Sequence, residues 1–249
     1  MLYFIANWKA NLSLNQLINW NKIFFEKITQ NQELLLQLAN NQIKIILCPP
    51  FPFLIPLKNQ LPSLPNLDLG AQDISRFETG SYTGEVTAQS LATIVKYVII
   101  GHSERRQYFK ETTTILKKKY FMALKYAIEP ILCLRNLKDP VFANCRFLAY
   151  EPVKAIGTGK NESPLQVVAF KNHLKLSPKT TFIYGGSVDE NNLLSYLNTQ
   201  TINGFLIGKA SLDPYQFYEI IKSSLLSVSY THLRAHETPE HLVCRLLLE

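Results

Sequence analysis

The sequence lacks several features that define common classes of protein. No apolar run approaches the roughly 18 consecutive residues that a membrane-spanning helix needs, so we expect no membrane association. The apolar start, residues 1–6, has no basic leader and meets the polar Asn7 and Lys9 at once, which argues against a signal peptide. The four cysteines show no metal-binding or redox spacing. This favours a reducing, cytoplasmic location and predicts no metal site.

Positive charge is in excess, but it is not concentrated. The chain has 26 Lys and Arg against 19 Asp and Glu, which gives a formal net charge of +7. The only dense run is residues 117–119, which we interpret as a solvated helix face. A basic stripe interleaved with aromatic residues, typical of nucleic-acid binding, is missing from the sequence. We therefore expect no nucleic-acid partner.

Eight short apolar runs recur along the chain, as in strands that are buried on both faces. Amphipathic stretches lie between most of them, and Leu17, Trp20, Phe24 and Ile28 show the helical period in the first. This alternation predicts an α/β protein whose parallel sheet closes into a (β/α)8 barrel. An open doubly wound sheet is the alternative, although no G-x-G-x-x-G follows the first run. The eight runs are residues 2–7, 43–48, 67–71, 97–101, 130–134, 147–151, 181–185 and 204–208.

Polar residues close several of these runs, where barrel enzymes carry their chemistry. Lys9 follows the first run, His102 and Glu104 follow the fourth, and Glu151 ends the sixth. A desolvated carboxylate has a raised pKa and can act as a general base, while an imidazole can donate to a carbonyl.

Glycine-containing turns close the last two runs, and their backbone N–H groups can bind phosphate. Taken alone, a glutamate is more often a cap, a histidine a core residue and a glycine turn a strand exit. Their joint placement predicts a barrel enzyme that acts on a small phosphorylated carbonyl compound by proton transfer.

Several strings in the sequence resemble the triosephosphate isomerase family. The most specific are I-G-H-S-E-R-R at 100–106, and A-Y-E-P-V with A-I-G-T-G at 149–159. The resemblance spans residues 1–226 in family order. It implies a TIM barrel and the interconversion of dihydroxyacetone phosphate and glyceraldehyde 3-phosphate (EC 5.3.1.1) in glycolysis and gluconeogenesis. The other matching strings are residues 7–9, 70–73, 83–85, 184–188 and 208–211.

The resemblance also implies roles for individual residues and needs no cofactor. Glu151 would be the base, and His102 would polarise the carbonyl as a neutral imidazole, which is the arrangement established in this family. Lys9 would stabilise the oxyanion, Asn7 would orient the substrate, and Glu104 would support Lys9. Residues 152–159 match the family's closing lid. The phosphate grip implied by the resemblance is Gly157, Ser187, Gly208 and the N–H group of Lys209. Thr83 lies in the loop that enters the partner subunit of the family's homodimer.

The sequence departs from the family pattern at two positions and in the length of one stretch. Lys154 stands where the lid usually has an aromatic residue, and Lys209 replaces the second glycine of a Gly-Gly pair. The stretch from His102 to Glu151 is shorter than in the family, so we expect the fifth helical unit to be shortened or missing. Either a compact loop closes the barrel there or the gene is damaged. The alternative is therefore a catalytically impaired relative with a binding or structural role. Another phosphate-using barrel enzyme, such as an aldolase or epimerase, is less favoured, because the sequence shows no Schiff-base lysine within a strand and no set of metal ligands at the rim.

The last part of the chain, residues 227–249, differs in composition from the rest. It contains no Lys, Asn or Ile, although all three are frequent before it. Its three histidines and Cys244 match no metal-site spacing. The segment resembles translated sequencing-adapter read-through at the end of an open reading frame. We therefore expect residues 1–226 to form the barrel and exclude the tail from it.

Overall fold

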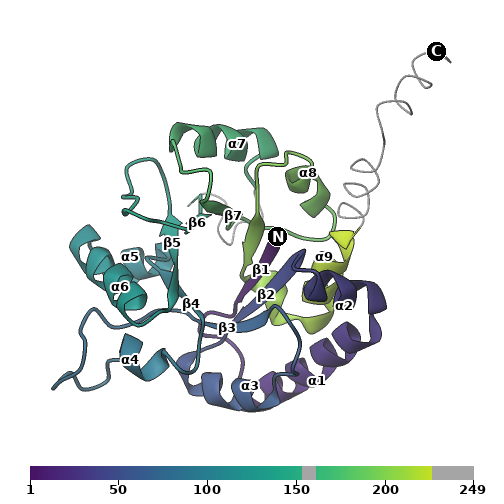
Figure 1. The fold of residues 1–249 in the computed structure, drawn as a ribbon, viewed down its shortest axis with the longest axis horizontal. Helices are drawn as coiled ribbons and strands as arrows, with labels where there is room; N and C mark the ends of the chain where they lie inside the picture. The colour runs from purple at the N-terminus through teal and green to yellow at the C-terminus, as the bar shows by residue number, and fades with distance from the viewer. Residues whose placement is uncertain (153–160, 226–249) are drawn as a thin grey trace.

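The eight apolar runs form eight parallel strands that close into a barrel in the order β1-β2-β3-β4-β5-β6-β7-β8 (Figure 1). The computed structural model describes residues 1–152 and 161–225. The predicted (β/α)8 architecture is confirmed. The strands are β1 Leu2–Asn7, β2 Ile43–Cys48, β3 Leu67–Ala71, β4 Tyr97–Ile100, β5 Glu129–Leu134, β6 Phe147–Tyr150, β7 Thr181–Tyr184 and β8 Gly204–Ile207.

Helices surround the barrel on its outside (Figure 1). In the part of the chain that the structure describes, none is long and apolar enough to cross a membrane. The α-helices are α1 Leu14–Gln30, α2 Gln32–Ala39, α3 Leu54–Gln60, α4 Ala88–Leu91, α5 Ser103–Tyr108, α6 Thr113–Lys125, α7 Pro164–His173, α8 Leu193–Leu197 and α9 Pro214–Ser223. Two 3-10 helices, η1 Phe51–Phe53 and η2 Lys209–Leu212, complete the set.

Helix α1 shows how local sequence sets the position of an outer helix. Ser13 and Gln16 form a reciprocal capping box that satisfies the first free N–H groups and fixes the start of the helix. The four apolar residues predicted for its inner stripe are all buried. Trp20 and Phe24 both pack against Phe217 of α9, with ring centroids 6.2 and 5.3 Å apart. This contact joins the first and last helices across the seam where the barrel closes.

The core has two layers. Side chains such as Ile5, Ile46, Ile99, Ile131 and Ile183 belong to a small inner cluster and are fully buried. A larger cluster fills the space between the strands and the outer helices. Because all strands run in the same direction, their carboxyl ends gather on one rim. The fold therefore brings together the polar residues that follow different runs.

The fifth unit has no helix. Residues 135–146 connect β5 to β6 as turns and irregular backbone, as the sequence predicted. Among the described residues, the place between α6 and α7 is occupied by this loop alone (Figure 1). Phe142 from the loop packs against Tyr120 of α6 at a ring distance of 5.2 Å. A compact connection near the lower limit of about 10–12 residues therefore replaces the missing helix.

Helix α6 corrects one interpretation made from the sequence. Its basic run was assigned to a solvated face, and for Lys119 this is wrong. The Lys119 ammonium is buried and lies 2.6 Å from both Asp73 and Glu111. The helical period turns this lysine inward toward the two carboxylates. On the same helix Leu124 is 39% exposed, whereas the neighbouring Ala123 is buried.

Candidate active site

A cavity of about 350 Å³ opens at the rim formed by the carboxyl ends of the strands. Its walls come from segments far apart in the chain, namely the ends of β1, β6, β7 and β8 and the start of α5. Most of the predicted site residues meet here. Those that line the cavity are Asn7, Lys9, His102, Glu151, Ser187, Gly208 and Lys209. Gly157, the lid motif from Val153 onward and Lys154 lie outside the described residues.

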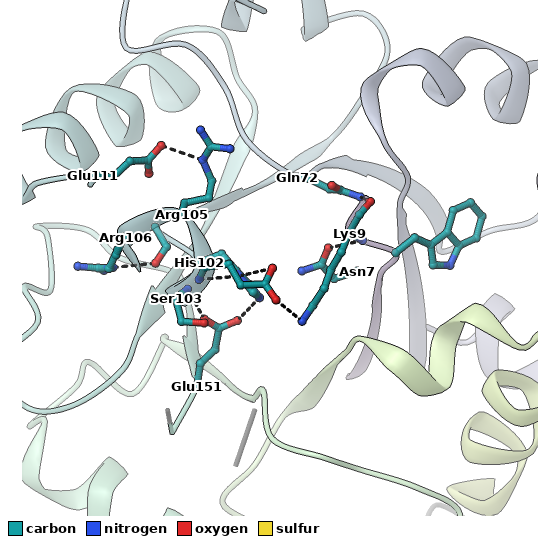
Figure 2. A network of polar contacts seen from close by, with 12 residues as sticks. Asn7, Lys9, Gln72, His102, Ser103, Arg105, Arg106, Glu111 and Glu151 are labelled. Atoms are coloured by element: carbon teal, nitrogen blue, oxygen red, sulfur yellow. Dashed lines mark hydrogen bonds and ion pairs between the residues drawn. The ribbon is translucent and has the colours of Figure 1, made fainter. Parts of the chain in front are cut away.

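Glu151 is the most deeply buried acidic group of the site, with only 1% of its surface exposed. Its Oε1 lies 2.9 Å from Nε2 of His102 (Figure 2). Its Oε2 accepts a hydrogen bond from the backbone N–H of Ser103, at 2.9 Å. Both partners come from the start of α5, so this helix holds the carboxylate from two sides.

The two groups shift each other's protonation in opposite directions. Burial alone lowers the pKa of His102, but the Glu151 carboxylate outweighs it, and the pKa is raised above its usual 6.5. Burial alone raises the pKa of Glu151, but the charge and hydrogen bond of His102 outweigh it, and the pKa lies below its usual 4.5. The expected rise of the Glu151 pKa is therefore wrong for this arrangement, because the direct contact with His102 dominates over desolvation.

The geometry around His102 sets which nitrogen carries the proton in the neutral ring. His102 is the N-cap of α5, and its Nδ1 accepts a hydrogen bond from the backbone N–H of Glu104 at 3.3 Å. Nδ1 is therefore an acceptor, and the proton of a neutral imidazole lies on Nε2, which faces Glu151. The ring is thus oriented to donate from Nε2 toward the cavity side of the rim.

Lys9 is held in an unusual backbone conformation at the end of β1. Its φ of 52° lies in the left-handed region, which non-glycine residues rarely adopt. Three contacts compensate for it: Nζ binds Glu104 at 2.6 Å, the carbonyl oxygen accepts from Gln72 at 2.9 Å, and the N–H donates to Oδ1 of Asn7 at 3.2 Å. Strained residues of this kind cluster at functional sites, where the surroundings fix them. Figure 2 shows Lys9 between Gln72 and the His102 side of the site.

Closely packed glycines form the other wall of the cavity, at the ends of β7 and β8. A Cβ on Gly185 would lie 2.9 Å from Cγ of Glu151, and one on Gly186 would lie 2.1 Å from the hydroxyl of Tyr184. These turns therefore need glycine for close packing. Lys209 is the first residue of η2. Its φ does not lie in the left-handed region that favours glycine. Its backbone thus accommodates a side chain where the family has glycine.

Two residues of the site were not predicted as functional from the sequence. Ser103 contributes through its backbone N–H group, which any residue type carries, so no sequence signal marks it. Gln72 binds the carbonyl oxygens of Lys9 and Cys48, both at 2.9 Å. It lies in a matching string of the family, which is the one signal that pointed to it.

A buried charge cluster lies next to the site on α5 and α6. Arg105 contacts Asp73 at 2.9 Å and Glu111 at 2.8 Å, and Lys119 contacts the same two carboxylates. Burial raises the pKa of Asp73 to about 6, against the opposing charges of Lys119 and Arg105. The cluster ties the loop after β3 to α5, the helix that is capped by His102. Figure 2 shows the contact of Arg105 with Glu111.

The closed barrel and its rim define a class of protein. A buried carboxylate, an imidazole and an ammonium group surround a cavity whose opposite wall is built of glycine turns. In residues 1–152 and 161–225, no group of three or more His, Cys, Asp or Glu side chains could hold a metal ion. The molecule is a (β/α)8-barrel enzyme whose site is built for proton transfer.

The chain belongs to the triosephosphate isomerase family. The family's sequence profile, described as "Triosephosphate isomerase", matches residues 2–144 and 140–224. The break between the two matches falls in the connection from β5 to β6. Similar curated proteins are the triosephosphate isomerases of Alkalilimnicola ehrlichii (34% identical, covering 88% of this chain and 96% of the relative), Mesomycoplasma hyorhinis (36%, 87% and 96%) and Mycoplasma genitalium (34%, 88% and 97%).

Proposed function

We propose that this chain interconverts dihydroxyacetone phosphate and D-glyceraldehyde 3-phosphate through an enediolate. The observation that carries the proposal is the contact of the buried Glu151 carboxylate with Nε2 of His102 inside the rim cavity. Membership of the triosephosphate isomerase family supports it. The alternative of an impaired relative finds no support in the site, because the shortened fifth unit leaves Glu151, His102 and Lys9 together at the rim.

Binding of the substrate uses opposite walls of the cavity. The phosphate group takes the wall formed by the glycine turns, where Ser187, Gly208 and the N–H group of Lys209 bind it, together with Gly157 from outside the described range. The carbonyl end then faces Asn7 and Lys9. The positive potential of Lys9 attracts the dianionic substrate and stabilises the oxyanion that forms at the carbonyl. Glu104, at 2.6 Å from Nζ of Lys9, keeps this ammonium in place.

Proton transfer requires Glu151 and His102 to exchange partners. Nε2 of His102 faces Glu151, so a substrate carbonyl must take over this N–H group. Glu151 then loses the neighbour that lowers its pKa, while its burial, which raises the pKa, remains. The carboxylate becomes more basic as the substrate binds. It removes the proton from one carbon, and His102 and Lys9 stabilise the enediolate oxygens. His102 donates its Nε2 proton to the former carbonyl oxygen and takes up the proton of the neighbouring hydroxyl oxygen, while Glu151 returns the carbon-bound proton to the adjacent carbon.

The reaction moves protons between adjacent carbons and causes no net oxidation, so we propose that it proceeds without a cofactor or a metal. As an aldose–ketose isomerase of triose phosphates, the enzyme would act in glycolysis and gluconeogenesis. Both are carried out in the cytoplasm, which agrees with the three free cysteines of the described ranges.

We further propose a homodimer. The loop between β3 and α4 projects away from the barrel (Figure 1). Phe77 and Tyr82 stack on each other in this loop with ring centroids 4.0 Å apart, and Tyr82 is 42% exposed. Burial of these rings against a second copy would offset the cost of ordering the loop. Gln72 and Asp73 at its base contact Lys9 and Lys119, so a docked loop would also stabilise the site.

A coupled assay with glyceraldehyde 3-phosphate tests the proposed function. Product is detected by the reduction of dihydroxyacetone phosphate with a glycerol-phosphate dehydrogenase. The purified chain should show saturable turnover, and Glu151→Gln prepared in parallel should lose nearly all of it. A folded wild-type chain without turnover would favour the impaired relative instead.

A further inference from the structure

The loop that replaces the fifth helix contains a buried carboxylate, Asp139. Its side chain is only 7% exposed. It accepts hydrogen bonds from the backbone N–H and from Nε and Nη2 of Arg135, at 2.8, 2.9 and 2.8 Å. It also contacts Nη1 of Arg106 at 3.3 Å. One carboxylate therefore joins the end of β5 to helix α5.

Arg106 is the more deeply buried of the two arginines, with a side chain that is 4% exposed, against 31% for Arg135. Its Nε donates to the carbonyl oxygen of Gly101 at 2.8 Å, and its Nη2 donates to that of Cys133 at 2.7 Å. The guanidinium thus bridges the carboxyl ends of β4 and β5. Asp139 is the carboxylate that pairs with it in the part of the chain that the structure describes.

The bridge lies directly behind the catalytic groups. Arg106 belongs to α5, the six-residue helix that begins at Ser103 and is capped by His102. These two residues make both contacts to Glu151. Any shift of α5 against β5 and β6 therefore changes the distance between the imidazole and the base. Arg106 fixes this distance, and a buried guanidinium needs a counter-charge to stay where it is.

We propose that Asp139 is a positioning residue for the isomerase reaction: it neutralises Arg106 and thereby holds the start of α5, with His102 and Ser103, against Glu151. In this chain the short loop from β5 to β6 takes over a task in the site as well as closing the barrel. The proposal rests on the isomerase activity proposed above.

The test compares the kinetics of Asp139→Asn with those of the wild type. The variant keeps the size of the side chain but removes its charge. Because a displacement of about 1 Å at a catalytic group can cost about 100-fold in rate, we expect kcat to fall by about 10- to 100-fold. KM should change by less than about threefold, since the proposed phosphate wall is carried by the ends of β7 and β8 and not by this loop. Asp139→Glu retains the charge and should recover part of the lost kcat.

Two matched controls separate positioning from general loss of stability. Glu129→Gln removes the carboxylate of an ion pair with Arg146 at the opposite end of β5, 3.0 Å long, and should leave kcat within about twofold. Arg135→Gln removes the more exposed partner of Asp139 but leaves the backbone N–H at 2.8 Å to hold this carboxylate, so it should lower kcat less than Asp139→Asn does. Circular dichroism and the melting temperature are recorded for each variant.

The outcomes are distinct. An inactive wild type contradicts the proposed function and not this role. With an active wild type, a normal kcat in Asp139→Asn overturns the proposal, as does an equal loss in Glu129→Gln or Arg135→Gln. If Asp139→Asn does not fold, Asp139→Glu decides: a kcat that is largely retained at unchanged KM supports the role of the Asp139 charge, and a fall of about 100-fold despite the retained charge overturns it.

Discussion

At the scale of single residues, the site depends on one nitrogen with two possible partners. Nε2 of His102 faces Glu151, and the proposed reaction needs the same N–H group at the substrate carbonyl. Without this contact the buried Glu151 carboxylate would be unpaired, which would raise the free energy of the folded state. It also keeps the base weak until substrate arrives. The contact thus stabilises the two proposed catalytic groups while they remain at the rim.

Shortening the base is the most direct test of its role. In Glu151→Asp the carboxylate retreats by one methylene group from the substrate carbon and from His102. General base catalysis contributes roughly 10²–10⁴-fold, so kcat should fall by at least about 100-fold. Steady-state kinetics in both reaction directions measure this. Near-normal turnover in Glu151→Asp would show that another group removes the proton.

The same pair predicts how stability depends on pH. The raised pKa of His102 gives a stabilisation that is complete below pH 6.5 and is lost as the pH rises through the folded-state value. The lowered pKa of Glu151 gives a second stabilisation of the folded state. It is complete above pH 4.5 and is lost as the pH falls through the folded-state pKa. Both stabilising contributions are therefore complete between pH 4.5 and 6.5.

Urea unfolding of the wild type and of Glu151→Gln measures this window. The difference in the free energy of unfolding should be largest near pH 5.5 and should become smaller as the pH rises through the raised folded-state pKa of His102, because the imidazole then loses its charge. A difference that stays constant from pH 5.5 to 8.5 would contradict the proposed charge interaction between the two side chains.

At the scale of elements, the sequence predicted the strands well and the charge pairs poorly. Strands buried on both faces must be apolar throughout, so their runs stand out without an alignment. That Lys9, His102 and Glu151 would meet at one cavity was predictable because the carboxyl ends of parallel strands share one rim. Asp139 and Lys119 gave no such signal, since their pairing depends on how loops and helices pack in three dimensions. Ser103 acts through its backbone, which residue type does not reveal.

The buried cluster on α6 allows a comparison between adjacent lysines. Lys119→Met leaves Asp73 and Glu111 buried with Arg105 as their remaining cation. Removing one partner of a buried ion pair costs roughly 3–5 kcal/mol, so we expect a destabilisation of about 3 kcal/mol. Lys118→Met on the exposed face of the same helix is the control and should change stability by less than about 0.5 kcal/mol. Equal effects in urea unfolding would show that the cluster does not stabilise the fold.

At the scale of the whole molecule, we propose that residues 227–249 are no part of the barrel. The family profile ends its match at residue 224, which supports this boundary. Equilibrium sedimentation of the full chain and of a chain ending at residue 226 tests the boundary and the proposed dimer together. Both should be dimers at micromolar concentration, with the same melting temperature and activity. A fully active monomer would contradict the dimer, and a loss of stability in the shorter chain would contradict the boundary.

The short connection between β5 and β6 also bears on how the barrel assembles. Among neighbouring strands this pair is the closest in sequence, with Ile131 opposite Phe147, whereas closure of the barrel joins Tyr3 to Gly204. The entropy lost on closing a loop grows with its length, so strands 5 and 6 meet at the lowest cost and strands 1 and 8 at the highest. The short connection, which contains no helix, thereby lowers the local contact order. It has made the middle of the chain a favourable place for folding to begin.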